Sequence, residues 1–308
     1  MLSIDDLNAK IKSGIIAIVG RANVGKSTLL NGILEEKVSI VSDVAQTTRN
    51  LIRAVLTEPR GQLVFLDTPG VHRATYDLGK MMNRMARSSV EGADVVMLVL
   101  DGSERPFEED DGWMRKIAKQ ALPAVIVLNK IDLGTPYADE YRAQWEDISR
   151  KNPDHCAAVP WFDISAANHD GVAELVQALF DRVPLGPPLF SEDVLTDFPR
   201  KLAMGDVIRE KLFHELHDEL PHAIAVGVNH IDESPETGWL AHADIYVNRP
   251  SQKGIVIGQK GRLLRKIKRL AEKDISDMYD VPVTLELWVK VEKDWAKNFW
   301  ILRQLGYA

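Results

Sequence analysis

The chain has 308 residues, of which 45% are hydrophobic and 27% are charged, and its formal net charge is −7. This length suits two globular domains, and the composition excludes collagen-like, coiled-coil and disordered chains. No apolar run approaches the roughly 20 residues of a membrane span, and the acidic start predicts no secretory signal. The single cysteine, Cys156, cannot form an internal disulfide, which favours a reducing compartment.

Apolar strands alternate with amphipathic helices in the first 183 residues. We expect strands at 15–19, 51–56, 62–66, 94–100, 124–128 and 157–164, and helices at 26–34, 77–91, 107–120, 139–151 and 172–182. This alternation predicts an α/β domain with a mostly parallel sheet that helices cover on both faces. The short turn between the second and third strands favours a local antiparallel hairpin.

A proline-rich stretch, 184–199, precedes a region in which the order of expected helices and strands is different. It contains four prolines and a glycine, and we interpret it as a linker between a first domain, 1–183, and a second domain, 200–308. In the second domain we expect helices at 201–216, 261–278 and 294–305, and strands at 222–230, 238–247 and 283–291. This order predicts an α+β fold.

A glycine-rich loop follows the first strand and opens the first helix. From Gly20 to Ser27 it has the spacing of a phosphate loop, in the strand–loop–helix context that this motif requires. Backbone N–H groups would bind a polyphosphate, Lys26 would reach its β- and γ-phosphates, and the Ser27 hydroxyl would bind Mg²⁺. The candidate phosphate-binding residues are Gly20, Asn23, Val24, Gly25, Lys26, Ser27, Thr28 and Gly70.

Two segments have the features of nucleotide-sensing switches. Asp67-Thr-Pro-Gly70 ends the third strand, where a carboxylate can hold Mg²⁺ and a backbone N–H can sense a γ-phosphate. A threonine of Gln46-Thr-Thr-Arg49 could bind the same metal, and we favour Thr48 over Thr47. The alternative is that this segment is a polar loop without a role in metal binding. The candidate switch residues are Thr47, Thr48, Asp67, Thr68, Pro69 and Val71, and the candidate Mg²⁺ ligands are Ser27, Thr48 and Asp67.

Asn129-Lys-Ile-Asp132 follows the fifth expected strand and suits a guanine base. A carboxylate accepts hydrogen bonds from guanine N1–H and N2–H₂ together, a donor pair that adenine lacks. The Lys130 stem would cover the ring, Asn129 would brace the phosphate loop, and the backbone N–H of Ala166 would reach guanine O6. Because ligands bind at the carboxyl ends of parallel strands, the four motifs together predict a guanine-nucleotide site. The candidate guanine-binding residues are Asn129, Lys130, Asp132, Ser165, Ala166 and Ala167.

The residue after Gly70 is Val71, where Ras-type GTPases place a water-orienting glutamine. Valine cannot hydrogen-bond water. We interpret the neighbouring His72 as a solvated loop residue, and the alternative is that it has a direct role in holding the attacking water. Asn23 offers another route, because an amide oxygen inside the phosphate loop could help to coordinate K⁺ beside the phosphates. The alternative is that Asn23 only braces the loop.

The second domain carries one strongly basic segment. Residues 201–308 hold 16 basic and 16 acidic residues, but 249–273 hold nine basic residues and one acidic residue. Within it, Gly258-Gln-Lys-Gly261 precedes a basic helix, which is the KH arrangement that lets backbone approach a nucleic-acid strand. The alternative is a solvated helix surface. The candidate RNA-binding residues are Lys253, Gly258, Gln259, Lys260, Gly261, Arg262, Arg265 and Lys266.

With the stretches 249–258 and 302–307, these motifs resemble the Era family of bacterial GTPases over nearly the full length of the chain. The resemblance implies a GTPase domain and a type II KH domain with α-β-β-α-α-β order, with GTP or GDP and Mg²⁺ as ligands. It implies binding to the 3′ region of 16S ribosomal RNA and a role in small (30S) subunit maturation, without a DNA partner. It also implies a cytoplasmic location and allows a weak peripheral association with the inner face of the cell membrane.

This sequence departs from the family pattern at two places. Ala22 stands where proline is common, and Gly-Gln-Lys-Gly stands where Gly-Lys-Gly-Gly is more common, which could adjust RNA affinity. A hydrophobic residue at position 71 is usual in the family. Two rival interpretations stay open: a GTPase that acts on tRNA or large-subunit RNA, and an RNA-binding protein with a static nucleotide domain.

Overall fold

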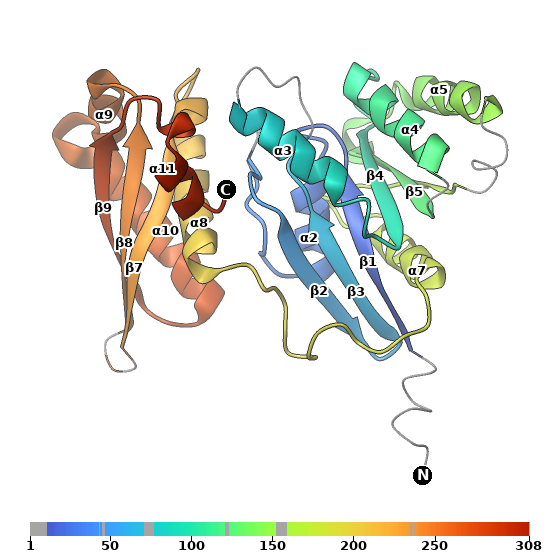
Figure 1. Cartoon of the computed structure of the whole chain (residues 1–308), viewed down its shortest axis with the longest axis horizontal. Coiled ribbons are helices and arrows are strands. Elements are labelled where there is room, and N and C mark those ends of the chain that lie inside the picture. The colour runs from blue at the N-terminus through green and yellow to red at the C-terminus, as the bar shows by residue number, and fades with distance from the viewer. Residues whose placement is uncertain are drawn as a thin grey trace, which may run out of the picture. The chain divides into compact units, whose positions relative to one another are not determined.

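The computed structural model describes residues 11–42, 44, 47–70, 77–120, 123–151, 159–234, 236 and 238–307. The chain divides into two compact units. The first comprises Met1–Ser39, Thr48–Ala74 and Met82–Asp197, and the second comprises Ile40–Thr47, Thr75–Met81 and Phe198–Ala308. Each unit contains its own β-sheet (Figure 1).

The first unit is built on a six-stranded sheet with the order β2-β3-β1-β4-β5-β6. Its strands are β1 (Lys12–Val19), β2 (Ile52–Glu58), β3 (Gly61–Asp67), β4 (Val95–Asp101), β5 (Ala124–Asn129) and β6 (Trp161–Asp163). Strands β2 and β3 form an antiparallel hairpin, and all other neighbours are parallel. The helices are α2 (Lys26–Leu34), α3 (Asp77–Ser88), α4 (Glu108–Gln120), α5 (Ala138–Arg150) and α7 (Val172–Arg182), with a 3₁₀ turn η1 (Ile131–Leu133). The mostly parallel α/β sheet is therefore confirmed.

Helices pack on both faces of this sheet because side chains alternate along each strand. In β1, Ile16 and Ile18 belong to the core that α2 and α7 complete, whereas Ala17 and Val19 belong to the core that α4 and α5 complete. All four side chains are fully buried. This two-sided burial explains why the strand has a continuous apolar sequence.

The proline-rich stretch after α7 is bound to the first unit up to residue 197. The backbone N–H of Val55 donates to the Leu195 carbonyl at 2.8 Å. The fully buried Gln62 amide donates to the Phe190 carbonyl at 3.0 Å and accepts from the Phe190 N–H at 2.9 Å. The Val55 contact pairs a backbone N–H of the edge strand β2, and the Gln62 contacts hold the same stretch to β3.

The second unit has a three-stranded sheet, with β7 (Ala225–Ser234) antiparallel and β9 (Val283–Val291) parallel to the central β8 (Gly238–Val247). Its helices are α8 (Arg200–Glu215), α9 (Pro250–Ile257), α10 (Arg262–Tyr279) and α11 (Phe299–Gln304), with 3₁₀ turns η2 (Pro221–Ala223), η3 (Gln259–Gly261) and η4 (Trp295–Lys297). Ile208 of α8 and Ile267 of α10 share a buried core with the sheet. Up to β9 the order is helix-strand-strand-helix-helix-strand, as expected for a KH domain.

Several boundaries differ from the sequence-based expectation. The single helix at 294–305 is wrong: η4 and α11 are separate, because the Asn298 side chain accepts from the Trp300 and Ile301 N–H groups and starts a new helix. The strand expected at 222–230 begins only after η2. Strand β6 is shorter than the expected 157–164, and residues 152–158 lie outside the described ones. Helix α9 lacked a periodic pattern; Pro250 occupies its first turn.

Candidate functional site

The four nucleotide motifs come together at one edge of the first unit's sheet. Strands β1, β3, β5 and β6 run parallel within this sheet, so their carboxyl ends lie at the same edge (Figure 1). The phosphate loop follows β1, the Asp67–Gly70 turn follows β3, and the guanine loop follows β5. This placement is the one that the motif order predicts.

The Asn129 side chain joins three of these loops. It is 2% exposed, its Nδ2 donates to the Val24 carbonyl at 2.8 Å, and its Oδ1 accepts from the Ala166 N–H at 2.9 Å. Gly25 has φ 92°, and a Cβ there would lie 2.3 Å from Asn129 Nδ2. Glycine at this position therefore allows the phosphate loop and the guanine loop to make contact.

Lys26 points its ammonium back into the phosphate loop. Its Nζ donates to the carbonyls of Gly20 at 3.3 Å and Arg21 at 2.7 Å. Burial lowers the pKa of Lys26 to about 8, although the nearby Asp67 opposes this shift. A polyphosphate anion would stabilise the charged form of this buried ammonium.

Two serine hydroxyl groups donate to the carboxylate of Asp67, and the Thr48 hydroxyl contacts one of them. Ser27 Oγ lies 2.8 Å from Asp67 Oδ2 and 2.9 Å from Thr48 Oγ1, and Ser39 Oγ donates to the same Oδ2 at 2.8 Å. Burial raises the pKa of Asp67, although Lys26 and the serine hydroxyls act in the opposite direction. The structure thus brings together all three predicted metal ligands.

The two candidate threonines have different environments. Thr47 Oγ1 donates to the Val44 carbonyl at 2.5 Å, and the Thr47 carbonyl accepts from Arg209 Nη2 at 2.6 Å, both within the second unit. Thr48 instead contacts Ser27. The contacts of Thr48 therefore match the predicted metal role better than those of Thr47.

The turn after β3 lies against the phosphate loop. Thr68 Oγ1 donates to the Ile18 carbonyl at 2.7 Å, and Pro69 is buried. A Cβ on Gly70 would lie 2.6 Å from the Ala22 Cα, so this close approach requires glycine. Val71, Gln46 and His72, which the sequence analysis singled out, lie outside the described residues.

The side chains for the guanine base differ in burial, since Ser165 is buried whereas Asp132 is exposed. Ser165 Oγ donates to Asp132 Oδ1 at 2.5 Å and accepts from the Asn168 N–H at 3.2 Å, and Asp132 itself is exposed. Lys130 Nζ lies 2.6 Å from Asp101 Oδ2. Ala167 lies in the turn after Ala166.

The sequence analysis did not identify Asn31 and Ser39, which support the predicted metal ligand Asp67. Asn31 Oδ1 accepts from the N–H groups of Val38 and Ser39, and Asn31 Nδ2 donates to the Ser39 carbonyl. These bonds fix Ser39 beside Asp67. A polar residue such as Asn31 inside an otherwise apolar helix stretch is the signal that could have identified this support.

The predicted RNA surface surrounds the turn between α9 and α10. Gly258 and Gly261 both have φ 72°, and Lys260 between them has φ 52°. The side chains of Gln259, Lys260, Arg262, Arg265 and Lys266 are exposed, whereas Lys253 is half-buried. Lys266 Nζ lies 2.7 Å from Glu215, while Lys260 and Arg262 form no ion pair with another described residue. Cationic groups thus remain available for phosphates.

Among the described residues, no helix combines the length and the apolar composition that crossing a membrane requires.

The chain matches two family models, one of a 50S ribosome-binding GTPase over residues 15–130 and one of a KH domain over residues 219–296. The protein named GTPase Era from Geotalea uraniireducens is 40% identical over 301 residues, which cover 97% of this chain and 98% of the relative. GTPase Era from Lacticaseibacillus paracasei is 40% identical over 295 residues, covering 96% of each.

Two solved structures share the fold over nearly the whole length. Era in complex with MgGDPNP and nucleotides 1506–1542 of 16S ribosomal RNA has a TM-score of 0.88 and 36% identity, and the match covers 97% of this chain and 99% of that one. An Aquifex aeolicus Era variant bound to GDP and AlF₄⁻ also has a TM-score of 0.88 and 36% identity, covering 97% and 100%. With its GTPase and KH units and these full-length relatives, the chain belongs to the Era family of GTPases.

Proposed function

We propose that this GTPase uses the site at the edge of the six-stranded sheet to bind and hydrolyse GTP, and that its KH unit binds the 3′ region of 16S ribosomal RNA during small-subunit maturation. The observation that carries the proposal is Asn129, whose side chain joins the phosphate loop to both segments of the guanine site. A site with these three loops in contact has the geometry to recognise the base and the phosphates together.

The RNA partner is proposed from the solved Era complex and from the exposed cations around Gly258–Gly261. Phosphate contacts by lysine and arginine supply affinity, and the apolar groove beside a KH turn can receive unpaired bases. The GTPase family that matches residues 15–130 is named for binding to the 50S ribosome. Large-subunit RNA is therefore the rival RNA partner, and a test of the proposal must include it.

The residues fit a Mg²⁺ ion. Magnesium prefers oxygen ligands, and the Ser27 hydroxyl lies within hydrogen-bond distance of oxygens of both Thr48 and Asp67. The buried Asp67 Oδ1 has no hydrogen-bond partner among the described residues, so it is available to the metal or to a water bound to it. When bound, Mg²⁺ would neutralise charge on the β- and γ-phosphates. Lys26 would bind the same phosphates, and Asp132 would orient the base.

We also propose that K⁺ binds beside Asn23. This residue is exposed on the phosphate loop and adopts φ 64°, a left-handed conformation that asparagine tolerates. An amide oxygen there suits a loosely coordinated cation, which would stabilise negative charge in the transition state where Val71 cannot orient water. The alternative, in which Asn23 only braces the loop, predicts no difference between K⁺ and Na⁺.

We propose that residues 1–183 form the GTPase domain and that residues 200–308 form the KH domain. We also propose that the protein is located in the cytoplasm. Weak peripheral binding to the cell membrane stays a prediction of the family resemblance. Cosedimentation of the purified chain with anionic lipid vesicles would test it.

The deciding experiment is crosslinking of the protein to RNA in cells, followed by sequencing of the bound RNA. We expect fragments from the 3′ end of 16S ribosomal RNA, and their loss in a Gly261→Asp variant that still binds GTP. Enrichment of tRNA or 23S fragments would contradict the proposed partner. Steady-state phosphate release from GTP, measured on the same preparations, would exclude the static-scaffold alternative if turnover is observed.

A further inference from the structure

Next to the phosphate loop lies a cluster of charged groups to which the motifs assign no role. The guanidinium of Arg21, the second residue of the loop, lies 3.7 Å from Asp101, 2.5 Å from Glu104 and 3.4 Å from Asp110. It also lies 4.6 Å from the centroid of the Phe107 ring. The side chains of Asp101 and Asp110 are 1% and 0% exposed, so this cluster differs from an ordinary surface ion pair.

Asp101, the last residue of β4, uses both carboxylate oxygens. Its Oδ1 accepts from the Ser103 N–H at 3.0 Å and from Ser103 Oγ at 2.6 Å. Its Oδ2 lies 2.6 Å from Lys130 Nζ and 3.7 Å from Arg21 Nη2. Burial opposes ionisation, but hydrogen bonds from Lys130 and Ser103 hold the pKa of Asp101 below its ordinary value. One ionised carboxylate therefore lies between a phosphate-loop residue and a guanine-loop residue.

Asp110 lies on another side of Arg21. Its Oδ2 accepts from the Phe107 N–H at 3.1 Å and from Tyr141 Oη at 3.2 Å. Burial raises the pKa of Asp110, so its charged form depends on these donors and on the guanidinium. Removing one partner of a buried ion pair leaves the other charge uncompensated, at a cost in free energy. The buried carboxylates therefore hold the Arg21 guanidinium in its position.

Both ends of this cluster belong to the nucleotide site. The Arg21 carbonyl accepts one hydrogen bond from Lys26 Nζ, at 2.7 Å. At the other end, Lys130 adopts φ 68°, a left-handed conformation that a non-glycine residue keeps only where its surroundings hold it. The ion pair with Asp101 is one contact that holds the Lys130 side chain.

We propose that Asp101 is a positioning residue for guanine nucleotides, which holds Lys130 and Arg21 together so that the guanine loop and the phosphate loop act as one unit. This inference rests on the nucleotide site proposed above and deepens it. Loss of the Asp101 charge should release Lys130 from its place over the base and should loosen the loop that binds the phosphates.

The test is a double-mutant cycle on the dissociation rate of mant-GDP from the full chain. Asp101→Asn keeps the side-chain size and removes the charge, and Lys130→Met keeps the apolar stem and removes the ammonium. We expect each substitution to accelerate dissociation about tenfold, and the double variant to differ little from either single variant, because all three lose the same contact. Arg21→Lys keeps one charge without the planar fork and should accelerate dissociation less.

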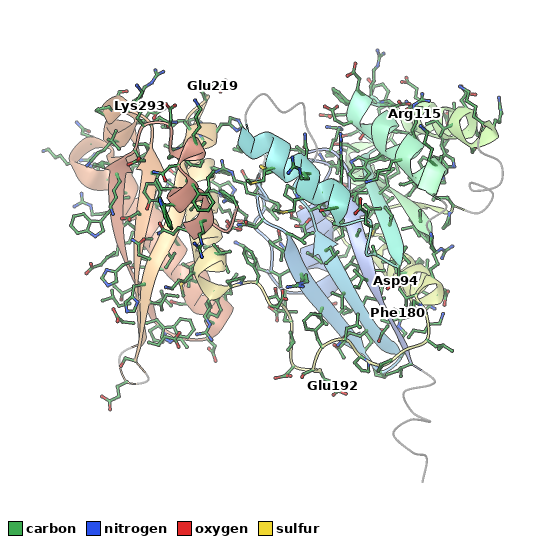
Figure 2. The ribbon with its side chains drawn as sticks, in the orientation of Figure 1. Asp94, Arg115, Phe180, Glu192, Glu219 and Lys293 are labelled. Atoms are coloured by element: carbon green, nitrogen blue, oxygen red, sulfur yellow. The ribbon has the colours of Figure 1, made fainter. Side chains whose placement is uncertain are left out.

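Arg115→Gln is the matched control. It removes the exposed Asp111–Arg115 ion pair, 2.6 Å long, from helix α4, which also carries Asp110 (Figure 2 labels Arg115). This substitution should leave dissociation unchanged. If Asp101→Asn does not fold, Ser103→Ala removes one anchor of Asp101 and should accelerate dissociation a few-fold. Additive effects of Asp101→Asn and Lys130→Met, or unchanged dissociation from Asp101→Asn, would overturn the proposal. Unchanged mant-GDP binding by Lys26→Ala would instead overturn the nucleotide site itself.

Discussion

The proposed nucleotide site and the proposed RNA surface are built in opposite ways. At the nucleotide site, Asn129 and Asp67 are buried and hydrogen-bonded to other protein groups. At the RNA surface, Lys260 and Arg262 are exposed and form no ion pair with a described residue. Groups that are already held in place bind a small ligand without a further loss of side-chain entropy. Exposed cations gain affinity by releasing counterions when they bind phosphates. Substitutions of the buried groups should therefore change both stability and affinity, whereas substitutions of the exposed cations should change affinity alone.

The largest expected effect concerns the choice of base. Asp132→Asn should weaken GTP binding by on the order of 2–4 kcal/mol, because it removes a charged acceptor for two guanine donors. The same variant should accept xanthosine triphosphate, whose exocyclic oxygen suits an amide donor. Competition titrations with both nucleotides measure this change.

Asp139→Asn is a suitable control for this variant, since Asp139 is exposed on the nearby helix α5. We expect it to bind GTP as the unmodified chain does. Equal GTP affinity of the Asp132→Asn variant, without any preference for xanthine, would contradict the assignment of the base site.

The second prediction compares the two glycines of the KH turn. No atom lies within 4 Å of a Cβ built on Gly261, whereas a Cβ on Gly258 would lie 2.7 Å from Leu263 Cβ. Gly261→Asp thus adds a negative charge without a steric clash, and should weaken single-stranded RNA binding by on the order of 1–4 kcal/mol with GTP binding intact. Both glycines have φ 72°, so a side chain strains the backbone at either position, and the additional contact with Leu263 should make Gly258→Ala lower thermal stability more than Gly261→Asp does. RNA titrations and thermal unfolding of both variants separate the two effects.

Salt dependence sharpens this prediction. If about four phosphates are contacted, log K should fall against log salt with a slope of roughly −3 in the unmodified chain. Arg262→Gln should make the slope shallower by about 0.7. RNA binding that does not respond to salt, or that survives Gly261→Asp unchanged, would show that the RNA surface lies elsewhere.

The third prediction concerns the cation beside the phosphate loop. GTP turnover should be several-fold to a few hundred-fold faster in KCl than in NaCl, because one well-placed charge stabilises the transition state by about 1–3 kcal/mol. Asn23→Ala should remove the difference. Steady-state phosphate release at equal ionic strength measures it, and equal rates of the unmodified chain in both salts would exclude the K⁺ site.

The sequence motifs predicted which residues come together at the candidate nucleotide site, but not the residues that hold them in place. Gly25, Lys26 and Asn129 are recognisable because a phosphate or a base imposes their type and spacing. Ser39 and Asp101 were missed, because their contacts with Asp67 and Lys130 depend on how distant segments pack.

The same limit explains the errors in the fold. Strands β8 and β9 were predicted to the residue, since their apolar positions alternate in a regular way. The C-terminal helix was predicted as continuous, because its apolar spacing does not reveal that Asn298 caps a second helix.

The smallest expected effect is the most direct test of the contrast between the two surfaces. Arg262→Gln should change the free energy of unfolding by less than about 0.5 kcal/mol, because the exposed guanidinium forms no ion pair with a described residue. Asn129→Ala should destabilise the nucleotide-free chain by about 1–3 kcal/mol, since it leaves the Val24 carbonyl and the Ala166 N–H unpaired inside the protein. Denaturant unfolding without nucleotide or RNA measures both. A larger loss from Arg262→Gln than from Asn129→Ala would mean that the cations around the KH turn support the fold, and that the nucleotide loops keep their arrangement without the Asn129 side chain.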